Sequence, residues 1–244
     1  MMRAVAVVAL VLAGLVAAPT AAVADTADCA LSDGTMSWGF KESFRSYISS
    51  TIANGEWTVA DGATYQTPDF GWTSGKGTFT TRSGGGSLAF AGSVTFTGHG
   101  GILNTTVANP VVSFVSPTTA HLLLDVSGTT QEGAVIDEKQ VQFAALDLAA
   151  GTTTVTGHRV SIHGATATLL PAGATAFGTY EAGEPLDPAT ITFTAGAGCA
   201  FTESQPAPVT PAPADNGLLL WLLTIPGAAL VVGAIVLWRR RQGA

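Results

Sequence analysis

The sequence is poor in cysteine and histidine, which limits the metal and catalytic chemistry that it can hold. It has two cysteines, Cys29 and Cys199, and these form no CxxC pair. It also lacks the GxSxG nucleophile elbow, the HExxH metalloprotease motif and the GxxxxGK(S/T) phosphate loop. We therefore expect a protein that is not an enzyme. The four histidines do not have the spacing of a standard zinc site; they are His99, His121, His158 and His163.

Basic residues are scarce in the part of the chain between its two ends. Residues 25–216 contain six basic and seventeen acidic side chains, a formal charge of −11. Such an acidic balance argues against nucleic acid, or an anionic surface, as the main partner. The segment is long enough to form one domain with a real hydrophobic core.

The N-terminus has the three zones of a secretory signal peptide. Arg3 is followed by an apolar run over residues 4–15, and Ala22-Val23-Ala24 fits the small-x-small cleavage rule. We therefore expect residues 1–24 to be a signal peptide and the mature chain to begin at Asp25. The alternative is an uncleaved N-terminal anchor.

The C-terminus carries a second membrane signal. Residues 217–238 are uncharged and largely apolar, and a membrane-spanning helix needs roughly 20 such residues. Three arginines open the tail at 239–244, and clustered basic residues stay on the cytoplasmic side. Residues 205–216 form a Pro/Ala-rich linker. The sequence predicts a single-pass cell-surface protein with an extracellular N-terminal domain over residues 25–204.

The two cysteines bracket this domain, Cys29 near its start and Cys199 after its last predicted strand. In a secreted chain, such a pair is most simply a disulfide. Closing so long a loop contributes roughly 4–5 kcal/mol in the chain-entropy model.

The body of the chain has the pattern of antiparallel sheet. Within residues 63–194, apolar and small or polar residues alternate in short runs between Gly, Pro and Asp. About ten strands fit, which predicts a mainly β fold of the α+β class, either a β-sandwich or a barrel-like sheet. The alternating apolar positions are Leu88, Phe90, Val94, Phe96, Leu122, Leu124, Val126, Val141, Phe143, Val160 and Ile162.

One N-terminal helix is expected to pack on this sheet, over residues 37–52. Ser37 is placed to cap it. Residues recur at spacings of three and four to give one largely apolar stripe, which consists of Trp38, Lys41, Phe44 or Arg45, and Ile48. Gly55 lies just beyond its expected end.

Two segments, residues 38–48 (WGFKESFRSYI) and 90–103 (FAGSVTFTGHGGIL), together resemble the HtaA domain, a haem-transport module of actinobacterial surface proteins. The resemblance continues through Asn109-Pro110 and ends in a late stretch like the family's FY-x-x-G-x-x-LDP pattern. It covers about residues 37–195. The late stretch is represented here by Phe177, Tyr180, Gly183, Leu186 and Asp187-Pro188.

The resemblance implies roles for two residues. A tyrosine of the first segment would be the axial ligand of ferric haem, and a histidine of the second would hydrogen-bond to it; these are Tyr47 and His99. Phenolate oxygen suits the hard Fe(III) ion, and tyrosine ligation is known among haem centres. The cargo would be ferric haem b, held without a covalent bond.

Five further residues have two interpretations each. Phe44 and Phe96 are either haem-face contacts or core packing. Arg45, like Lys41, either pairs with a haem propionate or is a solvated helix charge. Tyr180 either lines the pocket or packs at a strand end.

The function expected from the resemblance is capture of haem outside the cell and relay toward a membrane importer. Haem donor proteins are expected as further partners. The alternative is a structural or adhesive surface domain that has the fold and binds no haem.

Overall fold

The computed structural model describes residues 28–130, 133–178 and 180–205. The predicted signal peptide, the membrane span and its basic tail lie outside these ranges, as does all of the linker except Gln205. Within them, no helix is long and apolar enough to cross a membrane.

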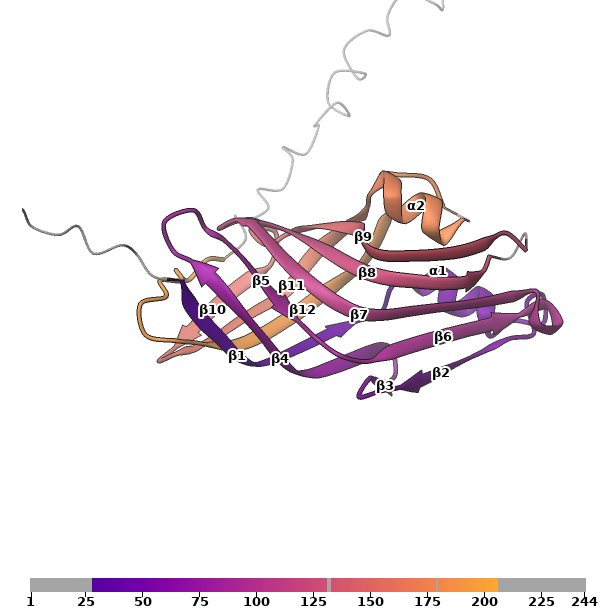
Figure 1. The fold of residues 1–244 in the computed structure, drawn as a ribbon, viewed down its shortest axis with the longest axis horizontal. Coiled ribbons are helices and arrows are strands. Elements are labelled where there is room, and N and C mark those ends of the chain that lie inside the picture. The colour runs from indigo at the N-terminus through magenta and orange to yellow at the C-terminus, as the bar shows by residue number, and fades with distance from the viewer. Residues whose placement is uncertain (1–27, 131–132, 179, 206–244) are drawn as a thin grey trace, which may run out of the picture. The chain divides into compact units, whose positions relative to one another are not determined.

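Eight antiparallel strands close into a barrel, in the order β7-β5-β4-β1-β12-β11-β9-β8 and back to β7 (Figure 1). The barrel resolves the choice that the sequence left open between a sandwich and a barrel-like sheet. Its strands are β1 (Cys29–Trp38), β4 (Asp69–Thr80), β5 (Gly85–Ala89), β7 (Leu103–Ser116), β8 (Thr119–Thr129), β9 (Val135–Asp147), β11 (Arg159–Leu169) and β12 (Pro185–Ala195).

Four shorter strands extend this ring. β6 (Ser93–Gly98) pairs with the first half of β7, and β2 (Glu56–Ala60) pairs with β6. β3 (Thr64–Gln66) pairs with β4, and β10 (Thr152–Thr156) with β11. At the end of the molecule that carries β2 and β6, the wall is therefore continued by strands outside the ring.

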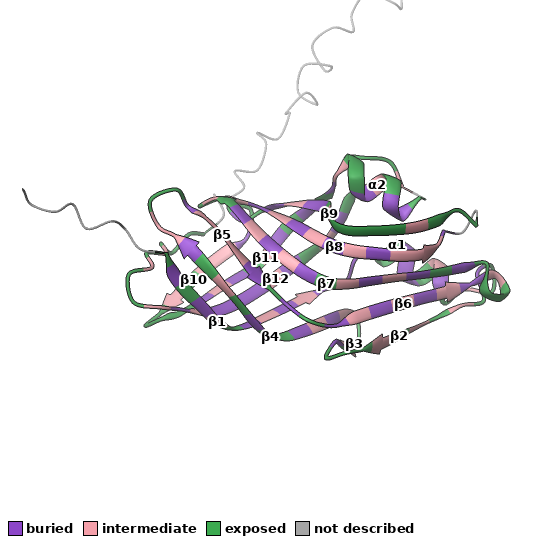
Figure 2. Cartoon of the chain, viewed as in Figure 1, coloured by how far each residue is buried: buried purple, intermediate pink, exposed green. Residues whose placement is uncertain are grey.

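The predicted alternation is confirmed in the strand interiors. In β8, Leu122, Leu124 and Val126 are buried, while the residues between them are partly exposed. Successive side chains of a strand point to opposite faces, so one face of each strand builds the core. The banding along the strands in Figure 2 shows the same alternation.

The first helix is shorter than the sequence predicts. α1 spans Glu42–Ile48, whereas Ser37 and Trp38 belong to β1. Trp38 is fully buried and pairs with Ala189 of β12. Its apolar side chain therefore packs in the barrel as part of a strand and does not belong to a helix face. Ser37 therefore caps nothing.

A second helix, α2 (Pro171–Phe177), was missed by the sequence reasoning. Its PAGATAF sequence has only one large apolar residue and thus no helical stripe. Packing holds it instead: a side-chain carbon at Gly173 would collide with the backbone of Phe143, so glycine allows α2 to lie against β9 (Figure 1).

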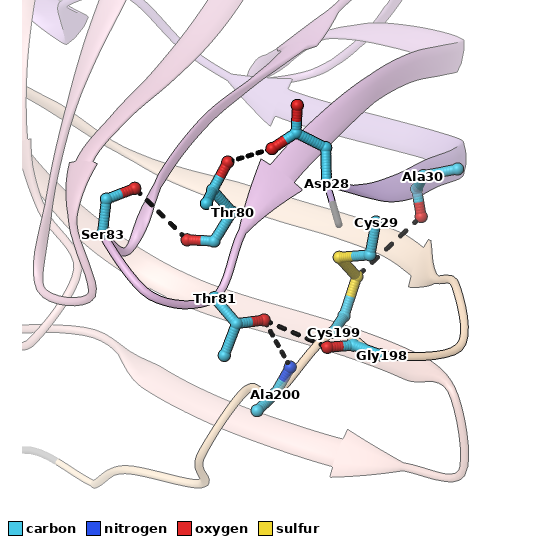
Figure 3. Close-up of a disulfide and its surroundings, with 9 residues drawn as sticks. All are labelled: Asp28, Cys29, Ala30, Thr80, Thr81, Ser83, Gly198, Cys199 and Ala200. Atoms are coloured by element: carbon cyan, nitrogen blue, oxygen red, sulfur yellow. Dashed lines mark hydrogen bonds between the residues drawn. A yellow bond between two sulfur atoms is a disulfide. The ribbon is translucent and has the colours of Figure 1, made fainter. Parts of the chain in front are cut away.

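The predicted disulfide between Cys29 and Cys199 is present, with the two Cα atoms 5.5 Å apart (Figure 3). It ties the first residue of β1 to the segment that follows β12. Nearby, Phe201 packs on Phe79 and Phe193, with ring centroids 4.4 and 5.1 Å away. The residues after β12 therefore pack against this end of the barrel.

Candidate functional site

The side chains of Tyr47 and His99 meet. The Tyr47 hydroxyl is hydrogen-bonded to Nε2 of His99, and the two ring centroids are 5.8 Å apart. Both residues are half-buried, so each keeps part of its surface open to solvent. The contact that the family resemblance implied is present in the fold.

Tyr47 stands in the last turn of α1. Phe44 and Ile48 of this helix are buried in the core, which leaves Tyr47 partly exposed beside them. Past the helix, the N–H and the Oγ of Ser50 both donate to the Tyr47 carbonyl, at 3.1 and 2.7 Å. The C-terminal end of α1 is therefore held by its own turn.

His99 begins η1 (His99–Gly101), a single 3-10 turn that joins β6 to β7. Its φ of 52° is left-handed, which is uncommon for residues other than glycine. Its backbone N–H donates to the carbonyl of Ala53 at 2.7 Å, which ties η1 to the turn after α1. A side-chain carbon at Gly100 or Gly101, the next two residues, would meet nothing within 4 Å, so both positions face open space.

Phe44 and Phe96 lie in the aromatic core. Phe96 is fully buried, and its ring contacts those of Phe40, Phe44 and Phe70 edge to face. Phe44 is 4 % exposed and also packs on Phe177. Both rings are therefore packed in the core, and their contact joins α1, through Phe44, to β6, through Phe96.

Arg45 is not a solvated charge, and its guanidinium already has partners within the protein. It is buried, it forms an ion pair with Asp187, and its guanidinium also donates to the carbonyl of Gly39. Lys41 is similarly engaged, 2.9 Å from a Glu184 carboxylate oxygen and 2.9 Å from the Pro185 carbonyl. Both cations therefore fasten α1 to the start of β12.

Tyr180 lies at the other end of α1 from His99. Its hydroxyl is 3.3 Å from the Ser43 hydroxyl, its ring stacks on Phe177, and the Lys41 ammonium lies 5.3 Å from its ring centroid. Ser43 precedes Tyr47 by one helical turn, so Tyr180 borders the same side of the helix. It is half-buried, with part of its surface exposed.

The sequence reasoning quoted Asp187 as part of a motif and gave it no role. In the structure, its carboxylate accepts the Glu42 N–H at 3.0 Å and pairs with Arg45. An acidic residue before Pro188 at the start of a strand could have drawn attention to this position. Its partner Arg45 is 142 positions away, however, and sequence spacing does not reveal such a pair.

Comparisons with known proteins agree with this fold. The HtaA family model, described as Htaa, matches residues 33–192, about two thirds of the chain. The chain belongs to the HtaA family. The matched part of this HtaA chain contains Tyr47, His99 and Asp187, while Cys29 and Cys199 lie outside it.

Solved HtaA structures are similar over nearly their whole length. The C-terminal domain of HtaA from Corynebacterium glutamicum is 31% identical, with a TM-score of 0.62, and the match covers 69% of this chain and 99% of that domain. The N-terminal domain of the same protein is 32% identical, with a TM-score of 0.51 and coverages of 67% and 97%.

The haem-binding protein HtaB from Corynebacterium glutamicum has the same fold. It is 23% identical to this HtaA-family chain, with a TM-score of 0.53, over 69% of this chain and 96% of that one. A search of curated proteins finds no match.

Proposed function

We propose that this chain is a cell-surface protein that binds ferric haem through the Tyr47 oxygen and passes it toward a haem importer in the membrane. The observation that carries the proposal is the hydrogen bond between Tyr47 and His99 at a partly exposed place in the fold. Membership of the HtaA family supports it.

The chemistry of the pair suits a ferric ion. A free phenol has a pKa of about 10, so a tyrosine ligand needs its anion to be favoured. The ferric ion supplies most of this, and an N–H donor from imidazole fixes the phenolate oxygen in place. Nε2 of His99 is the atom that contacts the Tyr47 oxygen. A phenolate oxygen can only accept, so His99 would be the donor of this hydrogen bond when haem is bound.

The surroundings of the pair fit a flat macrocycle. Gly100 and Gly101 leave open space next to His99, where larger side chains would stand in the way. Tyr180 borders the same side of α1 and is a candidate lining residue. The chain has no CxxCH segment, so the haem b group would be held without a covalent bond.

The relay role rests on the two ends of the sequence. A cleaved signal peptide over residues 1–24 would export the domain, and the apolar segment 217–238 would anchor it. The linker at 205–216 is short, so the domain would stay near the membrane surface. A domain held this close to the membrane is suited to deliver haem from donor proteins to a transporter.

The test is a titration of the full-length chain in detergent with ferric haem, followed by absorbance. Wild type should form a saturable one-to-one complex, and Tyr47→Phe, which removes only the hydroxyl, should not. Tyr65→Phe is the matched control, because Tyr65 is also half-buried but lies on β3. If wild type binds no more haem than an unrelated acidic membrane protein does, the structural or adhesive alternative replaces the haem function.

A further inference from the structure

Asp187 joins the start of β12 to the segment from Trp38 to Arg45 through every polar group that it has. Its backbone N–H donates to the Phe40 carbonyl at 2.8 Å, and its carbonyl accepts the Trp38 indole N–H at 2.8 Å. One carboxylate oxygen accepts the Glu42 N–H at 3.0 Å, and the other pairs with Arg45. All four partners lie between the last residue of β1 and the middle of α1.

The helix needs this support because it is short. α1 has seven residues, and helices of that length are marginal on their own in water. Its N-cap residue, Lys41, contributes no side-chain hydrogen bond. Asp187 supplies the missing acceptor from 145 positions along the chain.

Arg45 sets the rotation of the helix about its own axis. It is 8 % exposed, and it is held on one side by Asp187 and by the Gly39 carbonyl. Tyr47 follows two residues later, and two residues of an α-helix turn through about 200°. The ion pair and the Tyr47 ring therefore lie on roughly opposite sides of α1, and a rotation of the helix that moves one also moves the other.

We propose that Asp187 is a positioning residue for Tyr47: through Arg45 and the Glu42 N–H, it holds the phenol oxygen where it meets His99 and the haem iron. The inference rests on the proposed haem function. Functional side chains must be held to within about 0.5 Å by their supporting shell, and outer partners of a metal ligand account for about 10–100-fold in affinity.

The test is Asp187→Asn in the full-length chain in detergent. The amide keeps the shape and one acceptor, but it leaves the buried Arg45 cation without its counter-charge. We expect ferric haem to dissociate about 10–100-fold faster into an excess of a haem-free globin. The absorbance spectrum of the bound ferric haem should also depart from that of wild type, because the Tyr47 oxygen is displaced.

Asp147→Asn is the matched control. The Asp147 carboxylate accepts the N–H groups of Ala149 and Ala150, at 3.0 and 3.1 Å, in the turn that follows β9. The same substitution there keeps the Oδ1 acceptor and removes a carboxylate charge in a part of the chain outside α1. Urea unfolding of both haem-free variants measures the general loss of stability, and the haem spectrum and dissociation rate of Asp147→Asn should equal those of wild type.

Arg45→Lys decides the question if Asp187→Asn does not fold. Nη1 of Arg45 contacts both Asp187 and the Gly39 carbonyl. Lysine keeps the charge, but its side chain is one atom shorter and does not place its nitrogen at the Nη1 position, so haem should again dissociate faster. The positioning role is overturned if wild type binds haem and the folded variants keep its dissociation rate and spectrum, or if Asp147→Asn changes them equally. A wild type that binds no haem overturns the proposed function itself, and the inference with it.

Discussion

The side chains of Tyr47 and His99 are hydrogen-bonded to each other, and the His99 N–H also donates to the Ala53 carbonyl in the turn after α1. The turn that ends the helix therefore also holds the loop that presents the imidazole. α1 and η1, which are about fifty residues apart in sequence, therefore meet at the Tyr47–His99 pair. Substitution of either residue tests its contribution to haem binding.

Replacement of His99 should weaken haem retention without unfolding the domain. Asparagine tolerates the left-handed backbone of this position but is too short to reach the Tyr47 oxygen. We expect His99→Asn to release ferric haem about 10–100-fold faster than wild type. His121→Asn is the control, since His121 is also half-buried but lies on β8. Equal release rates for His99→Asn and wild type would remove His99 from the site.

Phe96 should matter for stability whether or not haem is present. It is fully buried among aromatic rings, so Phe96→Ala should lower the free energy of unfolding of the haem-free chain by about 3–5 kcal/mol. Urea denaturation followed by tryptophan fluorescence measures this change. Phe201→Ala, at a half-buried ring near the disulfide, should cost less. A haem-free Phe96→Ala variant as stable as wild type would contradict the packing role.

Asp125 should make stability fall in acid. Burial raises the pKa of its carboxyl, but hydrogen bonds from Asn109 and Gln140 and the nearby Lys139 outweigh this, so the pKa lies below its ordinary value of 3.8. A carboxyl whose pKa is depressed on folding stabilises the fold above its unfolded pKa, and this contribution is lost as pH falls through the folded value. Between pH 5 and pH 7, Asp125→Asn should therefore be less stable than wild type by about 1–2 kcal/mol.

That difference should shrink when the same urea titrations are run well below pH 4. Asp137→Asn is the control, because the Asp137 side chain is 77% exposed. Its carboxylate oxygen lies 3.9 Å from Nζ of Lys139, which is also an exposed side chain. A gap between wild type and Asp125→Asn that does not change with pH would show that the charge of Asp125 is not what stabilises the fold.

Loss of the disulfide should destabilise the domain and spare the haem site. The bridge spans 170 positions, so Cys29→Ser with Cys199→Ser should lower the free energy of unfolding by about 5 kcal/mol. β1 separates the bridge from α1 by ten strand residues, roughly 30 Å. Haem affinity of the folded double variant should therefore match that of wild type. Reduction of wild type should reproduce the loss of stability, and an unchanged unfolding midpoint would contradict the prediction.

Much of the architecture could be predicted from local pattern. Alternation identified Leu122, Leu124 and Val126 as core positions because the two faces of a strand meet different surroundings. The two cysteines allowed a single pairing, which the fold contains. Tyr47 and His99 were found by motif resemblance, and their contact is present.

Tertiary structure decided what depends on partners far along the chain. Closure of the barrel depends on the pairing of β7 with β8, and no local pattern distinguishes that from a sandwich. Trp38 has the spacing of a helix face but lies in a strand, because Ala189 and Phe70 pair with it. For Arg45, the sequence left a haem-propionate partner and a solvated charge as alternatives, and its ion pair with Asp187 could not be derived from local pattern. Local sequence thus identified the core positions of strands such as β8, while contacts across more than a hundred residues determined where α1 begins and what holds Tyr47 in place.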